Sequence, residues 1–211
     1  MVDFRLYLIT DRMQTAGRTL PAVVADALRG GLRALQLREK DLSAAQLLEI
    51  AVELRQLTRE YGAKLLINDR VDVALAAGAD GVHLGKAGLP VPEARRMLGS
   101  ERLIGYSAHS VDEALQAQMA GADFVTLGPV YHTPSKAQYG EPLGLSALSE
   151  AVRVVAIPVF ALGGVKPASV AQVLSAGAHG VALISAVMAA PHPRVETEAL
   201  LRTIAHHAIA C

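Results

Sequence analysis

The stretch "AGADGVHLG" (77–85) recurs as "AGADFVTLG" (120–128) and "AGAHGVALI" (176–184). In each copy an Ala-Gly pair precedes an apolar run. Glycine after a helix accepts the left-handed conformation that closes it, so each copy predicts the end of a helix and the start of a strand. A junction repeated in this way favours a closed (β/α)8 barrel, with an open doubly wound sheet as the alternative.

The same alternation continues along the whole chain. Short β-rich runs alternate with Ala/Leu segments of helical period, the pattern of a parallel sheet. We expect strands at 6–10, 33–38, 64–67, 80–84, 102–106, 123–127, 157–161 and 180–184. We expect helices at 19–29, 43–60, 70–77, 91–98, 111–120, 145–154, 167–175 and 196–207. The fold class predicted is α/β, a single-domain (β/α)8 TIM barrel over residues 1–211.

Composition narrows the classes of function. The 211 residues, 52% hydrophobic, can bury one substantial core. Twenty Lys and Arg balance twenty Asp and Glu, so charge gives no reason to expect nucleic acid or a membrane as partner. No run reaches the length of a membrane span or a signal-peptide core, which predicts a cytoplasmic protein. The single cysteine excludes a Cys-based metal cluster, and the Ala/Leu-rich outer helices would allow a homodimer.

In such a barrel the site is built where the strands end. Gln36, Arg38 and Lys40 alternate at the end of the second strand and would point to one side, offering an amide and two cations to an anion. The alternative is a solvated strand end whose cations pair with Glu39 and Asp41.

The third and fifth strands also end in polar residues. Asn68 or Asp69 could simply cap the next helix. Asp69 is also a lone carboxylate among cations, which suits Mg²⁺ shared with substrate phosphates. After the fifth strand Ser110 is expected to cap a helix, while Ser107 is free to donate; His109 is expected to be a structural loop residue.

The irregular stretch 128–144 carries Thr133, Ser135 and Lys136. Two hydroxyls and an ammonium within four residues suit a phosphate or a carboxylate, although a plain solvated loop is the alternative. The sequence contains no evident Ser-His-Asp, Cys-His or paired-carboxylate arrangement. Neutralisation of a leaving group therefore fits better than nucleophilic catalysis by the protein.

Small residues follow the last two strands. Gly163 and Gly164 come after the seventh strand and Ser185 after the eighth, where barrels of this kind usually bind phosphate. Ordinary turn chemistry is the alternative. The strand ends therefore predict two anion sites, one cationic enough for a pyrophosphate and one neutral and suited to a monophosphate.

Several segments together carry a resemblance. The chain contains, in order, "YLITD", "QLREKD", "INDRVDVAL", "GADGVHLG", "IGYSAHS", "GADFVTLGPVYHTPSK" and "ALGGV". Over nearly its whole length it resembles the thiamine phosphate synthases and their relatives, the thiazole tautomerases. The resemblance implies a transferase that joins two small-molecule substrates, a pyrimidine pyrophosphate and a thiazole phosphate, and releases pyrophosphate.

The resemblance also implies roles for residues that match the motifs. Catalytic roles near the pyrimidine and its pyrophosphate would fall to Arg38, Lys40, Ser107 and Lys136, with Gln36 and Asn68 binding substrate and Asp69 binding Mg²⁺. The thiazole would meet Thr133 and Ser135, and its phosphate would meet Gly164, Ile184 and Ser185.

One position departs from the synthase pattern. Gly88, in "KAGLP", stands where a second Mg²⁺-binding Asp is expected. Lys86 could supply charge instead if it turned inward. A thiazole tautomerase stays the main alternative, although Pro129 occupies the place of its expected catalytic His and only His132, three residues on, could replace it. A non-catalytic thiamine phosphate sensor is the second alternative.

Overall fold

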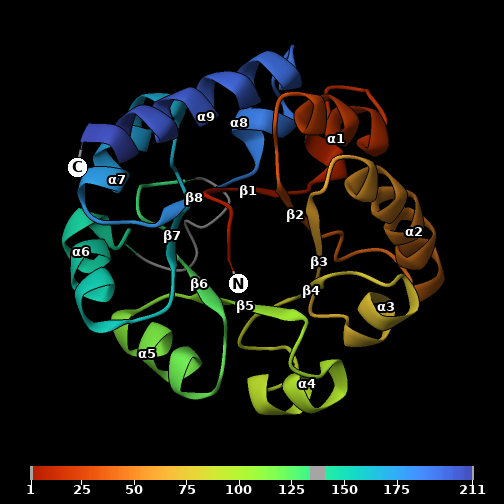
Figure 1. Cartoon of the computed structure of the whole chain (residues 1–211), viewed down its shortest axis with the longest axis horizontal. Coiled ribbons are helices and arrows are strands. Elements are labelled where there is room, and N and C mark those ends of the chain that lie inside the picture. Colours follow the sequence, from red (N-terminus) through yellow and green to blue (C-terminus); the bar gives the residue numbers. More distant parts are fainter. Residues whose placement is uncertain (1, 134–140, 211) are drawn as a thin grey trace.

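The chain folds into one closed barrel of eight parallel strands, ordered β1 to β8 with β8 beside β1 (Figure 1). The computed structural model describes residues 2–133 and 141–210, without the side chains of 208–210. The strands are β1 (Leu6–Ile9), β2 (Ala34–Leu37), β3 (Lys64–Asn68), β4 (Gly81–Leu84), β5 (Leu103–Ala108), β6 (Phe124–Leu127), β7 (Val159–Leu162) and β8 (Gly180–Leu183).

Helices form a ring around the strands (Figure 1). They are α1 (Leu20–Arg29), α2 (Ala44–Glu60), α3 (Val71–Ala76), α4 (Val91–Leu98), α5 (Val111–Met119), α6 (Gly144–Val154), α7 (Val170–Ser175), α8 (Ser185–Met188) and α9 (Pro193–Ala210). The short 3₁₀ helices η1 (Arg12–Gln14) and η3 (Pro167–Ser169) add to them. The predicted barrel is confirmed, whereas η1 and α8 were not expected, since three or four residues are too few to show a helical period.

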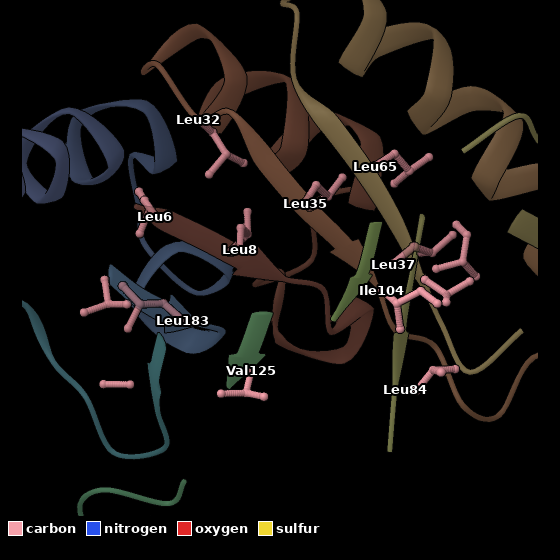
Figure 2. Close-up of a cluster of buried hydrophobic side chains, with 14 of the residues drawn as sticks. Leu6, Leu8, Leu32, Leu35, Leu37, Leu65, Leu84, Ile104, Val125 and Leu183 are labelled. Atoms are coloured by element: carbon pink, nitrogen blue, oxygen red, sulfur yellow. The ribbon is translucent and has the colours of Figure 1, made fainter. Parts of the chain in front are cut away.

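Alternation along the strands produces two cores. In β1, Leu6 and Leu8 face outward with Leu35 and Leu37 of β2, and they form the core beneath the helices. Figure 2 shows these four among the buried aliphatic side chains of that layer. The residues between them, such as Tyr7, face the barrel interior and form a second cluster. A period of two in each strand thus fills both sides of the sheet.

Aromatic rings fill one end of the interior. The segment before β1 runs into the centre of the ring of helices (Figure 1), where Phe4 is buried. The Phe4 ring centroid lies 5.6 Å from those of Tyr7 and Phe124 and 5.4 Å from that of Phe160. This apolar filling occupies the end where the strands begin and leaves polar interior residues to the opposite end.

The repeated junction behaves as its sequence predicts. Gly78, Gly121 and Gly177 follow α3, α5 and α7 with φ of 62°, 96° and 95°. Only glycine takes this left-handed region without steric cost, so each helix ends there and the chain turns into the next strand.

The acid of the repeat has a structural role that was not expected. Asp80 accepts a hydrogen bond from the Leu65 amide of β3 at 2.9 Å and pairs with Arg55 of α2 at 2.6 Å. In the next copy Asp123 accepts from the Ile104 amide at 2.6 Å and pairs with an arginine of α4 at 2.7 Å. Each carboxylate links the start of its strand to the preceding strand and to a helix.

Candidate active site

The ends of the parallel strands place the predicted site residues at one mouth of the barrel. Gln36 is the inward-facing residue near the end of β2, and its buried side chain donates to the Tyr7 hydroxyl at 3.2 Å. Arg38 and Lys40 follow β2, the first half-buried and the second exposed. Arg38 lies close enough to the interior for its charge to act on His83 of β4.

The neighbouring acids Glu39 and Asp41 form ion pairs with a residue other than Arg38 and Lys40. Glu39 and Asp41 both bind Arg12 of η1, at 3.2 Å and 2.6 Å from its Nη1. Within residues 2–133 and 141–210, neither the Arg38 guanidinium nor the Lys40 ammonium makes a hydrogen bond or an ion pair. The alternative of a self-neutralised strand end is therefore wrong, and this part of the mouth presents two uncommitted cations.

Asp69 directly follows β3, the strand that pairs with β2. Its Oδ1 accepts from the Gly85 amide at 3.0 Å, and its Oδ2 accepts from Asn68 Nδ2 at 2.9 Å. Arg70, not Asn68 or Asp69, occupies the N-cap position of α3, and no side chain caps that helix. The capping alternative is thus wrong for both residues.

A metal could bind at this carboxylate only with help from other ligands. The described part of the chain holds no group of three or more His, Cys, Asp or Glu side chains placed around a cation. A Cβ on Gly88 would lie 2.5 Å from Asp69 Oδ1, so position 88 does adjoin Asp69 but supplies no ligand. One carboxylate fits Mg²⁺ that takes its remaining ligands from water and substrate phosphates.

A chain of polar side chains crosses the interior beneath the mouth. The Tyr7 hydroxyl lies 3.4 Å from His83 Nδ1, and His83 Nε2 lies 3.0 Å from Ser107 Oγ and 3.3 Å from Thr126 Oγ1. Gln36 donates to the Tyr7 oxygen, which allows the Tyr7 proton to face Nδ1 and Nε2–H to face the two hydroxyls. In this tautomer Ser107 accepts from His83 and keeps its own proton to donate.

His83 is neutral in this position. Burial, followed by the charge of Arg38, lowers the pKa of His83 to about 3. Sequence reasoning missed His83, Tyr7 and Arg12. The available signal was a polar side chain at an inward position of an otherwise apolar strand, "GVHL".

The loop after β6 lies against the end of β7. The Val130 amide donates to Leu162 O at 2.9 Å and the Tyr131 amide to Gly163 O at 3.0 Å. Gly164 has φ of 67°, and a Cβ there would lie 2.6 Å from Tyr131 O. This glycine therefore has a packing role in addition to any contact with phosphate.

Ile184 and Ser185, predicted to form the second anion site, lie at the end of β8. Ile184 follows β8, and the exposed Ser185 begins α8. Thr133 is half-buried near the end of the described β6 loop. Ser135 and Lys136 lie outside the described residues, so their assignment stays a prediction.

Three expectations about nearby loops have clear outcomes. Lys86 does not turn inward: its side chain is 84% exposed and its Nζ lies 4.0 Å from Glu113 Oε1. His109 is anchored in its loop, with Nδ1 2.6 Å from Gly128 O, and Ser110 caps α5 as expected.

Two surface hollows lie away from the mouth. One, of about 550 Å³, lies between α7 and α9; the other, of about 340 Å³, lies where β3 and β5 begin. The second is lined by Arg55 and Asp80, which already pair with each other. The uncommitted cations, the fixed carboxylate and the supported serine occur together only at the mouth among the described residues, so we place the active site there.

A closed barrel with such a mouth defines a barrel enzyme for small-molecule substrates. The chain belongs to the thiamine monophosphate synthase family, whose sequence profile matches residues 6–187. None of the described helices combines the length and apolar character needed to cross a membrane.

Individual relatives agree with this family. A Geobacter sulfurreducens protein, provisionally named a thiamine-phosphate synthase, is 61% identical to this chain over 200 residues. The match covers 95% of this chain and 94% of the relative. The thiamine-phosphate synthase of Chloroflexus aurantiacus is 48% identical over 190 residues, which are 90% of this chain and 88% of the relative. The solved thiamine phosphate pyrophosphorylase of Pyrococcus furiosus superposes with a TM-score of 0.88 at 40% identity, covering 96% of each chain.

Proposed function

We propose that this protein is a thiamine-phosphate synthase. It joins 4-amino-2-methyl-5-hydroxymethylpyrimidine pyrophosphate to 4-methyl-5-(2-phosphooxyethyl)thiazole, or to the carboxylate of that thiazole with loss of CO2, and releases pyrophosphate. The observation that carries the proposal is the pair of uncommitted cations, Arg38 and Lys40, beside Asp69. The names of relatives at 46–48% identity support the same reaction.

The reaction breaks the bond between the pyrimidine methylene carbon and a pyrophosphate oxygen. The bonding electrons leave with pyrophosphate, and the thiazole nitrogen supplies the pair for the new C–N bond. Negative charge grows on the leaving group, so Arg38 and Lys40 stabilise the transition state more than the bound substrate. Lys136, if it reaches the same group, adds a third positive charge.

The remaining residues around β2 and β3 orient the pyrimidine half. Gln36 and Ser107, held by Tyr7 and His83, offer an amide and a hydroxyl to the polar edge of the ring. Asp69 would hold Mg²⁺ through its carboxylate, with Asn68 fixing that group. When bound, Mg²⁺ supplies further neutralisation of the pyrophosphate oxygens.

The thiazole half would occupy the opposite part of the mouth. Thr133 and Ser135 would contact the ring, while Gly164, Ile184 and Ser185 would bind its phosphate through backbone amides and a hydroxyl. This site is neutral, in keeping with the lower charge of a monophosphate. A cytoplasmic location and a homodimer complete the proposal.

One assay tests the function. Purified protein is incubated with the pyrimidine pyrophosphate, the thiazole phosphate and Mg²⁺, and thiamine phosphate and pyrophosphate are followed together. We expect equal amounts of the two products. No product at any Mg²⁺ concentration would overturn the synthase. Proton exchange on the thiazole carboxylate alone would then indicate the tautomerase, and binding of thiamine phosphate without turnover would indicate the sensor.

A further inference from the structure

We infer that Arg12 is a positioning residue that keeps the two cations after β2 available for the substrate, an inference that rests on the proposed function. The sequence after β2 reads Arg38-Glu39-Lys40-Asp41, in which charges of opposite sign alternate. Without a competing cation, the two acids would be the nearest partners for the two cations. The structure shows a different pairing, imposed by a residue from the preceding strand end.

Arg12 reaches both acids from η1. Its Nη1 donates to Glu39 Oε2 at 3.2 Å and to Asp41 Oδ1 at 2.6 Å, and its Nη2 binds the other oxygen of Asp41. A planar guanidinium can bind two carboxylates through separate N–H groups, which a lysine ammonium does less well. One side chain thus binds both acids of the loop.

The two acids differ in how firmly they are held. The Glu39 side chain is 3% exposed and also accepts from Thr10 Oγ1 at 2.7 Å and from the Arg12 amide at 3.1 Å. It would stay in place without the Arg12 side chain. The Asp41 side chain is 66% exposed, and Arg12 supplies its ion pair.

Asp41 is therefore the acid that Arg12 controls. Hydrogen bonds from Arg12 hold the pKa of Asp41 at about 2, so the group is charged throughout the range in which an enzyme of this kind works. Released from Arg12, this carboxylate could turn to Lys40 or Arg38 in the same loop. It would then compete with the pyrophosphate group of the substrate for positive charge.

A double-mutant comparison tests the inference. Arg12→Ala should raise KM for the pyrimidine pyrophosphate about two- to fivefold, the size expected for one partly exposed ion pair, with little change in kcat or in KM for the thiazole phosphate. Asp41→Asn alone should change KM little. Arg12→Ala combined with Asp41→Asn should restore KM towards the wild-type value, since the competing charge is gone.

Calorimetry with inorganic pyrophosphate and Mg²⁺ separates this inference from the proposed function, because it needs no turnover. We expect wild type, Asp41→Asn and the double variant to bind pyrophosphate with similar affinity, and Arg12→Ala to bind it more weakly. A double variant as weak as Arg12→Ala would overturn the inference and indicate that Arg12 itself contacts the anion. Wild-type affinity in Arg12→Ala would overturn it as well.

Discussion

Asp69 holds its carboxylate in a fixed direction through an uncommon backbone conformation. Its φ is 57°, in the left-handed region that Asp and Asn tolerate better than most residues. That conformation lets Asp69 Oδ1 accept a hydrogen bond from the amide of Gly85, the residue after β4. The carboxylate is thus oriented before any ligand arrives, which reduces the ordering that binding must supply.

Gly88 gives a test of the metal assignment at the scale of one residue. We expect Gly88→Asp to tighten Mg²⁺ binding, measured by calorimetry with pyrophosphate present, because its carboxylate would adjoin that of Asp69. Gly88→Ala is the matched control, since its Cβ, placed 2.5 Å from Asp69 Oδ1, would force the same displacement as that of Gly88→Asp without adding a ligand. Mg²⁺ should raise the Tm of Gly88→Asp more than that of Gly88→Ala. Equal shifts would show that position 88 does not serve the cation.

Lys136 is predicted to act on the leaving group. Lys136→Ala should lower kcat/KM by at least about tenfold, the size of one lost charge-assisted contact in a transition state, while the Tm stays within a degree or two. Lys86→Ala serves as control, because the Lys86 side chain is 84% exposed and its Nζ lies 4.0 Å from Glu113 Oε1. Unchanged kcat/KM in Lys136→Ala would remove this residue from the mechanism.

At the scale of elements, the acids of the repeated junction link strands to helices. The side chains of Asp80 and Arg55 are both largely buried, with 17% and 15% exposed. Asp80→Ala would leave Arg55 without its carboxylate and the Leu65 amide without its acceptor. We expect a loss of about 2–4 kcal/mol in the free energy of unfolding, measured with urea.

Asp72→Ala is the control for that substitution. Asp72 pairs with Arg70 in the first turn of α3, but its side chain is 62% exposed. An exposed pair of this kind contributes about 0–1 kcal/mol. Equal losses in Asp72→Ala and Asp80→Ala would contradict a special role for the junction acid.

The contact between the β6 and β7 loops can be tested with two glycines of similar conformation. Gly164→Ala combines a left-handed backbone, φ 67°, with a Cβ that would lie 2.6 Å from Tyr131 O. Gly62→Ala meets only the backbone cost, because Gly62 has φ of 62° and no atom within 4 Å of a Cβ. We expect about 1–2 kcal/mol of destabilisation for Gly62→Ala and at least about 1 kcal/mol more for Gly164→Ala. Gly164→Ala should also raise KM for the thiazole phosphate.

For the whole molecule, the buried His83 makes stability depend on pH. The ordinary pKa of His is about 6.5, whereas His83 in the folded chain has a pKa of about 3. Below pH 6.5, His83 binds a proton in the unfolded chain, whereas in the folded chain it stays neutral until the pH approaches 3. The stability is therefore complete above pH 6.5 and falls as the pH drops towards 3, by about 2 kcal/mol between pH 7 and pH 5 for this group alone.

His83→Gln should remove that part of the pH dependence in urea unfolding at pH 7 and pH 5. His179, whose pKa is also lowered, chiefly by burial, contributes in the same direction and remains in the variant. The comparison of wild type with variant therefore isolates His83. The same slope in both proteins would show that His83 is not held neutral.

The sequence predicts the barrel well because its periods are local. Strand alternation, helical spacing and the Ala-Gly junctions each depend on residues within a few positions of one another. The strand-end residues Gln36, Arg38 and Asp69 could be found for the same reason. The residues that support them could not: Arg12 and Glu39 are 27 positions apart, and Tyr7 and His83 are 76 apart. Only folding of the chain into the barrel brings such pairs together.

Closure also has a consequence for synthesis of the chain. The Arg5 side chain donates to His179 O, 174 residues away, and Leu6 of β1 pairs with Val181 of β8. At ribosomal rates of about 5–20 residues per second, roughly 9–35 s separate the synthesis of these partners. Throughout that interval the apolar segment around Phe4 and β1 has no β8 to join. One edge of the first strand therefore lacks its partner until the last strand has left the ribosome, whereas the other edge can pair with β2 much earlier.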